Sequence, residues 1–408
     1  MTLDPESTST LPPVGDAPKS SDRPTAWFLS RSMGRPSEVW LGRQIRAMAR
    51  FDPVWVHWEC VDAGVVGQAV RRRTLPWVPD PQDGPGRWSL RARNALSRNW
   101  YGTAGGERAA LTAAMREDRP AVVLAHFGHW ALRLLPVCNA LGVPLVCHFH
   151  GMDLSSMLRN KWYDASIRRG LRSFAASIVV GRRQASILEG LGAPADRLHW
   201  IPCGVPVADF ELGAGSEPGI TRFVAVSRLV AWKGPDVTLR AFAEVAAAEP
   251  AVELVMIGDG EEAGRLKALA VSLGVADKVK WQGAIGSAEV SAWMRRSDVF
   301  LQSSLDHASG WFEGFGVSVA EASSTGLAVV VSRCGGHVDQ VVDGQTGYLT
   351  EQGDPAAMAD RMLALVRDTS LRRRLGAAGR ARMASEFDVP AQVAKLENVL
   401  AEAAEGVA

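Results

Sequence analysis

Short apolar runs rich in β-branched residues alternate with longer amphipathic patterns, and the whole alternation occurs twice along the chain. The predicted strands are 26–30, 54–58, 121–126, 144–149, 177–180 and 198–201, followed by 223–227, 253–257, 279–282, 299–302 and 328–331. Strands that are apolar throughout are typical of parallel sheets covered by helices on both faces. The sequence therefore predicts an α/β fold of two doubly wound, Rossmann-like domains.

The borders of these domains follow from changes in composition. Residues 1–24 are expected to form a disordered tail, because Pro, Ser and Thr are frequent and the apolar segment of a signal peptide is missing. A stretch rich in Gly and Ser separates the two sets of strands. We therefore expect one domain at 25–210 and another at 211–388. The amphipathic pattern of residues 389–408 predicts a helix that packs back toward the first domain.

The charge of the chain is balanced overall but not along its length. The 45 basic and 44 acidic residues give a net charge of +1, which argues against a nucleic-acid binder. Residues 1–215 hold 26 basic and 19 acidic residues, whereas residues 216–408 hold 19 and 25. The two halves thus carry +7 and −6, which indicates domains with different partners. The five cysteines are scattered without a CxxC pair, as expected for a reducing cytoplasm.

Polar motifs follow the predicted strand ends of the second half, where ligands bind in doubly wound sheets. Arg228 and Lys233 lie five residues apart in a strand-to-helix loop, and both cations suit phosphate oxygens. Gly258 begins a Gly-Asp-Gly turn at which backbone can approach a ligand. Taken one at a time, such residues are more often ordinary surface.

The most specific motif is Glu313-Gly-Phe-Gly-Val-Ser-Val-Ala-Glu321, in which two carboxylates lie eight residues apart. We expect Glu313 in a loop and Glu321 inside a helix that begins near 316–317. The N-terminus of that helix can receive a phosphate, because its first N–H groups are unpaired and its dipole is positive there. The two carboxylates can then hold hydroxyl groups on either side of a diphosphate.

Together these motifs resemble the retaining glycosyltransferases of family 4, which have the GT-B fold of two Rossmann-like domains facing across a cleft. The segments that carry the resemblance are 313–321, 227–234, 258–260 and 335–347 in the second half, and 37–45, 125–128 and 149–153 in the first. The first-half segments are similar to the acceptor domains of members that build exopolysaccharide or lipopolysaccharide. One position departs from the family pattern, since Asp339 stands where the family usually has Glu.

The resemblance implies roles for individual residues. Glu313 would hold the hydroxyls of the donor sugar, Arg228 and Lys233 would neutralise the leaving diphosphate, and His150 would point at the sugar near its reacting carbon. The same comparison implies that Glu321 grips the ribose hydroxyls. The implied catalytic residues are His150, Glu313, Arg228 and Lys233, and the implied donor-binding residues are Arg228, Lys233, Gly258, Glu313, Phe315, Gly316, Val317 and Glu321.

The implied function is transfer of a sugar from a nucleoside-diphosphate sugar to a hydroxyl of a glycan, a lipid-linked acceptor or a small molecule. Two alternatives stay open. A sugar-nucleotide 2-epimerase shares the fold, although the spacing of Glu313 and Glu321 argues against it. A non-catalytic nucleotide-sugar binder would be expected to lose Glu313 or His150, and both are present.

We expect no metal and no cofactor. The chain has no Asp-x-Asp motif, which a nucleotide-bound divalent ion usually needs, and no HExxH spacing. His126 and His129 are interpreted as hydrogen-bonding residues of the core or pocket. His148 is expected to be structural and to face away from His150, on the opposite side of a strand.

The basic surplus of the first half suggests an anionic partner, and it includes the run Arg71-Arg72-Arg73. Each Lys or Arg near an anionic membrane contributes about 1 kcal/mol of binding. We therefore expect a cytoplasmic protein that can dock as a peripheral protein at the inner face of the membrane, or on a lipid diphosphate that carries a glycan.

Overall fold

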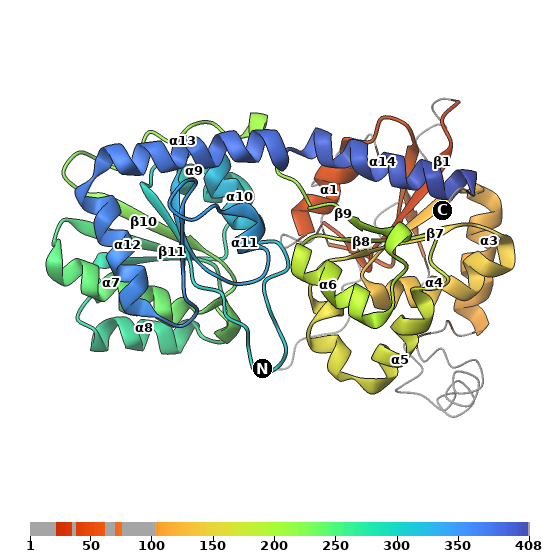
Figure 1. Ribbon diagram of the computed structural model, residues 1–408, viewed down its shortest axis with the longest axis horizontal. Coiled ribbons are helices and arrows are strands. Elements are labelled where there is room, and N and C mark those ends of the chain that lie inside the picture. The colour runs from red at the N-terminus through yellow and green to blue at the C-terminus, as the bar shows by residue number, and fades with distance from the viewer. Residues whose placement is uncertain are drawn as a thin grey trace, which may run out of the picture.

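The computed structural model describes residues 22–34, 38–61, 70–75, 101, 103 and 105–406. Two lobes, each built around a parallel sheet, lie side by side in Figure 1. The first sheet has the order β5-β3-β1-β6-β7-β8-β9 and the second the order β12-β11-β10-β13-β14-β15. Because the paired strands of both sheets are parallel, the α/β fold of two Rossmann-like domains predicted from the sequence is confirmed.

Where the sequence predicts a strand, the observed strand begins and ends within two residues of the predicted bounds. In the first domain they are β1 (Thr25–Leu29), β3 (Asp52–His57), β5 (Arg71–Thr74), β6 (Val122–His126), β7 (Leu145–Phe149), β8 (Ala176–Val179) and β9 (Leu198–Trp200), with a separate pair, β2 (Ser32–Met33) and β4 (Glu59–Cys60). In the second they are β10 (Thr221–Val226), β11 (Val252–Ile257), β12 (Val279–Gly283), β13 (Val299–Gln302), β14 (Ala328–Ser332) and β15 (Tyr348–Thr350).

Helices connect these strands and cover the sheets. Those of the first domain are α1 (Val39–Arg46), α3 (Gly105–Asp118), α4 (Gly128–Leu141), α5 (Lys161–Gly170) and α6 (Arg182–Leu191). Those of the second are α7 (Pro235–Ala248), α8 (Ala263–Ser272), α9 (Ser287–Arg295), α10 (Val317–Ser324), α11 (His337–Gln340), α12 (Pro355–Arg367) and α13 (Thr369–Glu386), and α14 (Val389–Glu405) ends the described chain. None of the helices within the described residues combines the length and apolarity needed to cross a bilayer.

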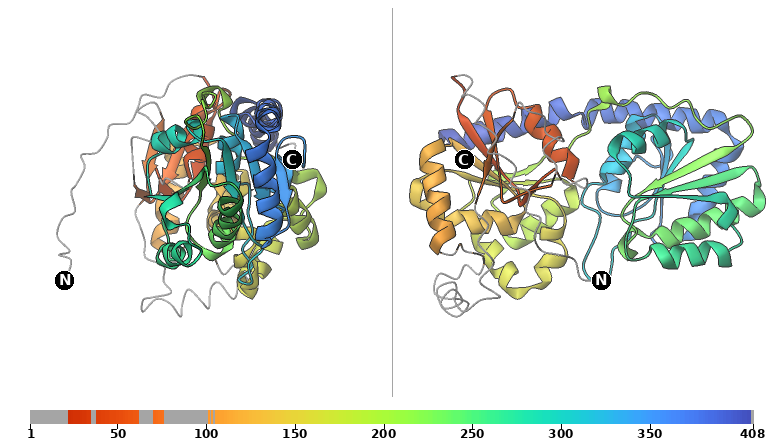
Figure 2. Two further views of the ribbon diagram at one scale, coloured as in Figure 1. Left: turned by 90° about the vertical axis from the view of Figure 1, so that its left-hand side faces the viewer. Right: turned by 180° about the vertical axis from the view of Figure 1, so that it is seen from behind.

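The last two helices join the domains. Helices α13 and α14 run one after the other along the same side of both lobes, as Figures 1 and 2 show. Leu396 and Leu400 of α14 are fully buried in one apolar cluster with Ala26 and Phe28 of β1. The end of the chain thus packs on the first sheet, after α13 has packed on the second domain.

The arginine run at 71–73 forms β5, an edge strand that the apolar patterns did not predict. Arg71 forms an ion pair with Asp52 at 2.6 Å, and Arg73 forms another with Asp118 at 2.5 Å. These two guanidinium groups therefore stabilise the sheet edge and are not free cations. The expectation that Arg71 and Arg73 meet an anionic surface loses its basis. The residues of the tail before Asp22 lie outside the described residues.

Candidate active site

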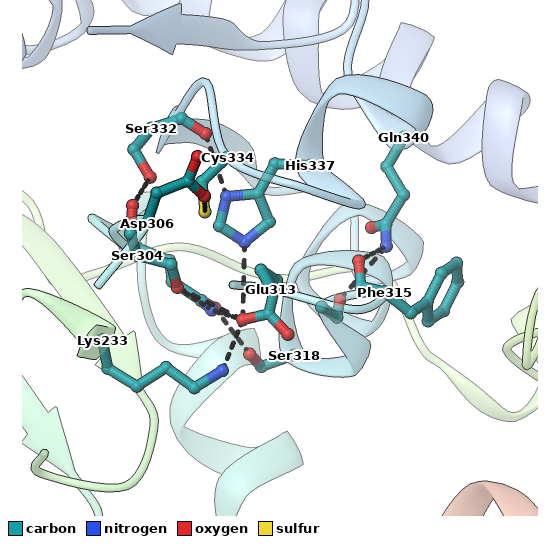
Figure 3. Close-up of polar contacts among 12 residues, drawn as sticks. Lys233, Ser304, Asp306, Glu313, Phe315, Ser318, Ser332, Cys334, His337 and Gln340 are labelled. Atoms are coloured by element: carbon teal, nitrogen blue, oxygen red, sulfur yellow. Dashed lines mark hydrogen bonds and ion pairs between the residues drawn. The ribbon is translucent and has the colours of Figure 1, made fainter. Parts of the chain in front are cut away.

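Glu313 lies in the loop that leads from the end of β13 to α10, and polar groups surround its carboxylate (Figure 3). The Lys233 ammonium group forms an ion pair and hydrogen bond with Glu313 Oε2. Gln302 Nε2 donates to the same oxygen over 2.9 Å, and Ser304 Oγ over 3.2 Å. The structure thus brings Lys233 and Glu313 together, although they are 80 residues apart in the chain. The sequence reasoning placed both at the donor but did not predict an ion pair between them.

This environment keeps Glu313 ionised. Burial acts to raise the pKa of the carboxyl, but the Lys233 charge, with hydrogen bonds from Lys233 and Ser304, outweighs it, and the pKa is lowered to about 2. Only 10% of the Glu313 side chain is exposed, so solvent screens the attraction weakly. The site therefore presents a fixed negative charge with oxygens that can accept hydrogen bonds from sugar hydroxyls.

His337 completes this arrangement, and the sequence reasoning did not identify it. Its Nδ1 donates to the Ser332 carbonyl over 3.0 Å, so Nε2 of the neutral ring carries no proton. Nε2 lies 3.9 Å from Glu313 Oε2 and has no hydrogen-bond partner among the described residues. Burial lowers the pKa of His337 despite the nearby Glu313 charge. The sequence feature that could have identified His337 is its position directly after the glycine pair Gly335-Gly336.

Close backbone packing shapes the loop around Glu313. A Cβ atom on Gly335 would stand 1.8 Å from the Glu313 carbonyl oxygen, so only glycine fits there. Gly316 has φ 88° and is the residue from which α10 begins. Gln340 Nε2 donates to the carbonyl of Phe315. In the first turn of α10, which begins at Val317, Ser318 Oγ donates to Gln302 Oε1, and Gln302 donates in turn to the Glu313 carboxylate (Figure 3). The start of α10 is thereby held near that carboxylate.

Arg228, the other cation predicted to bind the diphosphate, lies in the loop that follows β10. Arg228 lies with its guanidinium 5.3 Å from the ring of Trp232, which in turn stacks on Trp311 at 5.0 Å between centroids. Gly258 has φ 130°, and a Cβ atom there would stand 1.8 Å from the Ser227 carbonyl oxygen. Gly258 is thus required to let the ends of β10 and β11 approach, which is a structural reason for the Gly-Asp-Gly turn.

His150 enters from the first domain, just after β7. Asp153 accepts hydrogen bonds from the backbone N–H groups of Gly128 at 3.0 Å, His150 at 3.1 Å and Gly151 at 2.9 Å. A Cβ atom on Gly314 would stand 2.1 Å from the His150 carbonyl oxygen. The His150 segment therefore touches the loop that carries Glu313, across the boundary between the domains.

Three histidines gather at this point, which the sequence reasoning did not foresee. Nδ1 of His126 and Nε2 of His150 are 3.0 Å apart, and the rings of His148 and His150 are 4.3 Å apart between centroids. The expectation that His148 faces away from His150 is wrong, because residues two apart along a strand share a face. Burial, followed by the neighbouring histidines, lowers the pKa of His150 well below its ordinary value, so the ring is neutral.

The histidine cluster is also the one group of three within the described residues whose donor atoms could bind a metal. Potential ligand atoms of His126, His148 and His150 all lie within 4.8 Å of one another. Neutral imidazoles suit zinc and similar ions. In the structure, however, two of these nitrogens face each other in a hydrogen bond, and the ring of Trp40 covers His150 at 4.1 Å between centroids.

Glu321 and Asp339 face the first domain. Glu321, in α10, accepts a hydrogen bond from Arg43 of α1 at 2.7 Å. Asp339 accepts a hydrogen bond from the backbone N–H of Arg182 at 2.9 Å, and burial raises the pKa of its carboxyl. Asp339, the departure from the family pattern, therefore makes a contact between the domains.

Comparisons with known proteins agree with this architecture. Residues 67–209 match the model of Glycosyltransferase Family 4, and residues 215–382 match the model of Glycosyl transferases group 1. A GDP-mannose-dependent alpha-(1-6)-phosphatidylinositol monomannoside mannosyltransferase of Mycolicibacterium smegmatis is 26% identical, over 84% of this chain and 87% of the relative. The putative colanic acid biosynthesis glycosyltransferase WcaL of Salmonella typhimurium is 28% identical, over 59% of this chain and 60% of its own length.

Solved structures share the fold. The structure of HepE from Anabaena with UDP and glucose superposes with a TM-score of 0.73, at 19% identity, over 93% of this chain and 100% of HepE. Sucrose-phosphate synthase from Thermosynechococcus elongatus gives a TM-score of 0.71 at 17% identity, over 93% of this chain and 99% of the synthase. The two family models together match about three quarters of the chain, one on each domain. The chain therefore belongs to the family 4 glycosyltransferases and has the GT-B fold.

Proposed function

We propose that this glycosyltransferase is a retaining enzyme that moves a hexosyl group from a nucleoside-diphosphate sugar to an acceptor hydroxyl without a metal ion. The observation that carries the proposal is the environment of Glu313. Its ionised carboxylate lies beside the N-terminus of α10, and Lys233, Gln302 and Ser304 hold it in place. The Glu313 carboxylate suits sugar hydroxyls, and the N-terminus of α10 suits a diphosphate.

The reaction breaks the bond between the anomeric carbon of the sugar and a diphosphate oxygen. A new bond forms between that carbon and the acceptor oxygen, on the same face of the ring. Negative charge builds up on the departing diphosphate, where Lys233, Arg228 and the N–H groups at Phe315–Val317 would stabilise it. Glu313 would orient the sugar through its hydroxyls.

The acceptor hydroxyl must lose its proton during the transfer. A departing diphosphate oxygen can take that proton, so a separate general base is not required. Burial keeps His150 neutral, so the ring does not supply a cation to the departing anion. Its Nε2 faces His126 and its Nδ1 lies 3.9 Å from Cys203 Sγ, so a hydrogen bond to the donor sugar would replace one of these contacts. The His126 nitrogen at 3.0 Å fixes the orientation of the His150 ring.

Metal independence is part of the proposal. Lys233 and Arg228 supply the positive charge that a divalent ion provides in other nucleotide-sugar enzymes. Excess EDTA should leave the rate unchanged. A large loss that magnesium or manganese restores would contradict this part, and a loss that only zinc restores would point to the three-histidine cluster.

The acceptor is proposed to be a glycan or a lipid-linked glycan, and the protein is proposed to act in the cytoplasm, peripherally at the inner face of a membrane. Support comes from relatives whose names refer to phosphatidylinositol mannosides and to colanic acid. Co-sedimentation with vesicles tests the membrane part. Binding that needs anionic lipid and weakens with salt supports it, whereas no binding at low salt favours a soluble acceptor.

Incubation with a panel of UDP-, GDP- and ADP-sugars tests the reaction itself. A transferase releases free sugar slowly from its own donor, and Glu313→Gln should abolish that release. A 2-epimerase would instead return a nucleotide sugar with inverted configuration at C2. A non-catalytic binder would bind a donor and leave it intact over many hours.

A further inference from the structure

Arginines of the first domain reach carboxylates of the second at several places. Arg43 Nη2 donates to Glu321 Oε1, Arg183 Nη1 lies 2.7 and 2.8 Å from the two Asp306 oxygens, and the Arg182 backbone N–H donates to Asp339. In each contact the acid belongs to the second domain; Arg43 and Arg183 reach it with their guanidinium groups, and Arg182 with its backbone N–H. The opposite net charges of the two halves, noted in the sequence, fit this arrangement.

The contact between Arg43 and Glu321 differs from the others in its burial. The side chains of Arg43 and Glu321 are each 14% exposed, whereas those of Arg183 and Asp306 are 43% and 41% exposed. The Arg43 guanidinium also lies 5.8 Å from the ring of Phe210, in the segment that joins the domains. A pair shielded in this way interacts more strongly than an exposed one.

Both partners of this pair have unused hydrogen-bonding capacity. A carboxylate offers about four lone-pair sites, and Arg43 occupies one of them. The second terminal nitrogen of Arg43, Nη1, is buried and finds no hydrogen-bond partner in the part of the chain that the structure describes. A buried donor without a partner is uncommon in folded proteins, and a water, an ion or a bound ligand can supply the missing partner.

We propose that Arg43 is a positioning residue for the donor nucleotide: it holds Glu321 so that the free oxygens of this carboxylate accept the ribose hydroxyls. The inference rests on the proposed function and on the ribose contact that the family resemblance implies for Glu321. Because Arg43 belongs to the first domain and Glu321 to the second, the ribose site is complete only when the domains meet. Nη1 of Arg43 is then available to an oxygen of the bound nucleotide.

Calorimetric binding of UDP, GDP and ADP, each compared with its 2′,3′-dideoxy form, tests this role. Arg43→Met keeps an unbranched apolar stem of similar bulk to that of Arg43 and removes both the charge and the hydrogen bonds. We expect this variant to bind the ribonucleotide about tenfold more weakly, because a charge-assisted contact is lost. Its affinity for the dideoxy form should change less than about threefold, and Arg43→Lys should recover part of the loss.

Arg183→Met is the matched control, because it breaks an exposed contact between the domains and leaves Glu321 untouched. We expect less than about a twofold change with either nucleotide. Tighter nucleotide binding by Arg43→Met would show that Arg43 competes with the ribose for Glu321. Equal losses of affinity for the ribonucleotide and its dideoxy form would show that Arg43 has a general structural role. Either result overturns the inference. If the folded wild-type protein binds none of UDP, GDP and ADP, the proposed donor site fails as well. If Glu321→Gln weakens ribonucleotide binding and Arg43→Met does not, the inference alone fails.

Discussion

Replacing Lys233 by Met tests the electrostatics of the site without reference to any substrate. The ammonium group is the largest single influence that keeps Glu313 ionised against the effect of burial. The substitution keeps most of the aliphatic stem and removes the charge. It leaves a carboxylate that is 10% exposed with the hydrogen bonds from Gln302 and Ser304 and with no cation in contact.

The magnitude follows from the pKa of Glu313. A fall from 4.5 to about 2 corresponds to about 3 kcal/mol of stability at neutral pH. Because the pKa of Glu313 is lowered by folding, the ionised carboxylate contributes its full stabilisation above about pH 4.5. This stabilisation is lost as the pH falls toward 2. This net value already includes the opposing effect of burial, so Lys233→Met should lower the free energy of unfolding at pH 7 by about 3 kcal/mol or more, within the range measured for broken buried ion pairs.

Urea unfolding at pH 7 of the wild type, Lys233→Met, Glu313→Gln and the double variant measures this effect. The double variant should be more stable than Lys233→Met, because it no longer buries an unpaired charge. The reasoning is refuted if Lys233→Met stays within about 1 kcal/mol of the wild type. It is also refuted if the double variant is no more stable than Lys233→Met.

Three further predictions concern catalysis and acid stability. Arg228→Ala should lower kcat by about two orders of magnitude or more, through lost stabilisation of the leaving diphosphate, and an unchanged kcat in steady-state assays would place this loop away from the diphosphate. Glu321→Ala should mainly raise the KM for the donor, since ribose contacts are made equally in the ground and transition states. Burial lowers the pKa of His148 to about 3 and that of His57 to about 4, so each should cost about 2 kcal/mol of stability as the pH falls from 7 to 5. Urea unfolding of His148→Gln should show a smaller loss over that interval than the wild type does.

The fold was predictable because its strands are apolar throughout and recur in two sets. The edge strand β5 was not predicted, because its sequence Arg-Arg-Arg-Thr is polar. Its arginines are stabilised there by Asp52 and Asp118, which are 19 and 45 residues distant along the chain. Local composition cannot reveal partners at that distance.

The candidate site was predictable in part. The motif from Glu313 to Glu321 predicted a helix beginning near 316–317, and α10 begins at Val317. The rule that strand ends converge in a parallel sheet places the loops of Lys233 and Glu313 at one edge, whereas the ion pair between the two side chains was not predicted. The partners of Glu321 and Asp339 were not predictable, because Arg43 and Arg182 belong to the other domain. The three-histidine cluster was missed through a wrong assignment of strand faces.

The central claim is that the protein is a retaining glycosyltransferase. The most direct test uses proton NMR to determine the anomeric configuration of the sugar that is first released when the protein hydrolyses its own α-linked nucleotide-sugar donor. A retaining transferase releases the α-anomer before mutarotation, and Lys233→Met and Glu313→Gln should both abolish the signal. Release of the β-anomer first would show inversion. Release that is unaffected in both variants would show that the chemistry takes place elsewhere on the molecule.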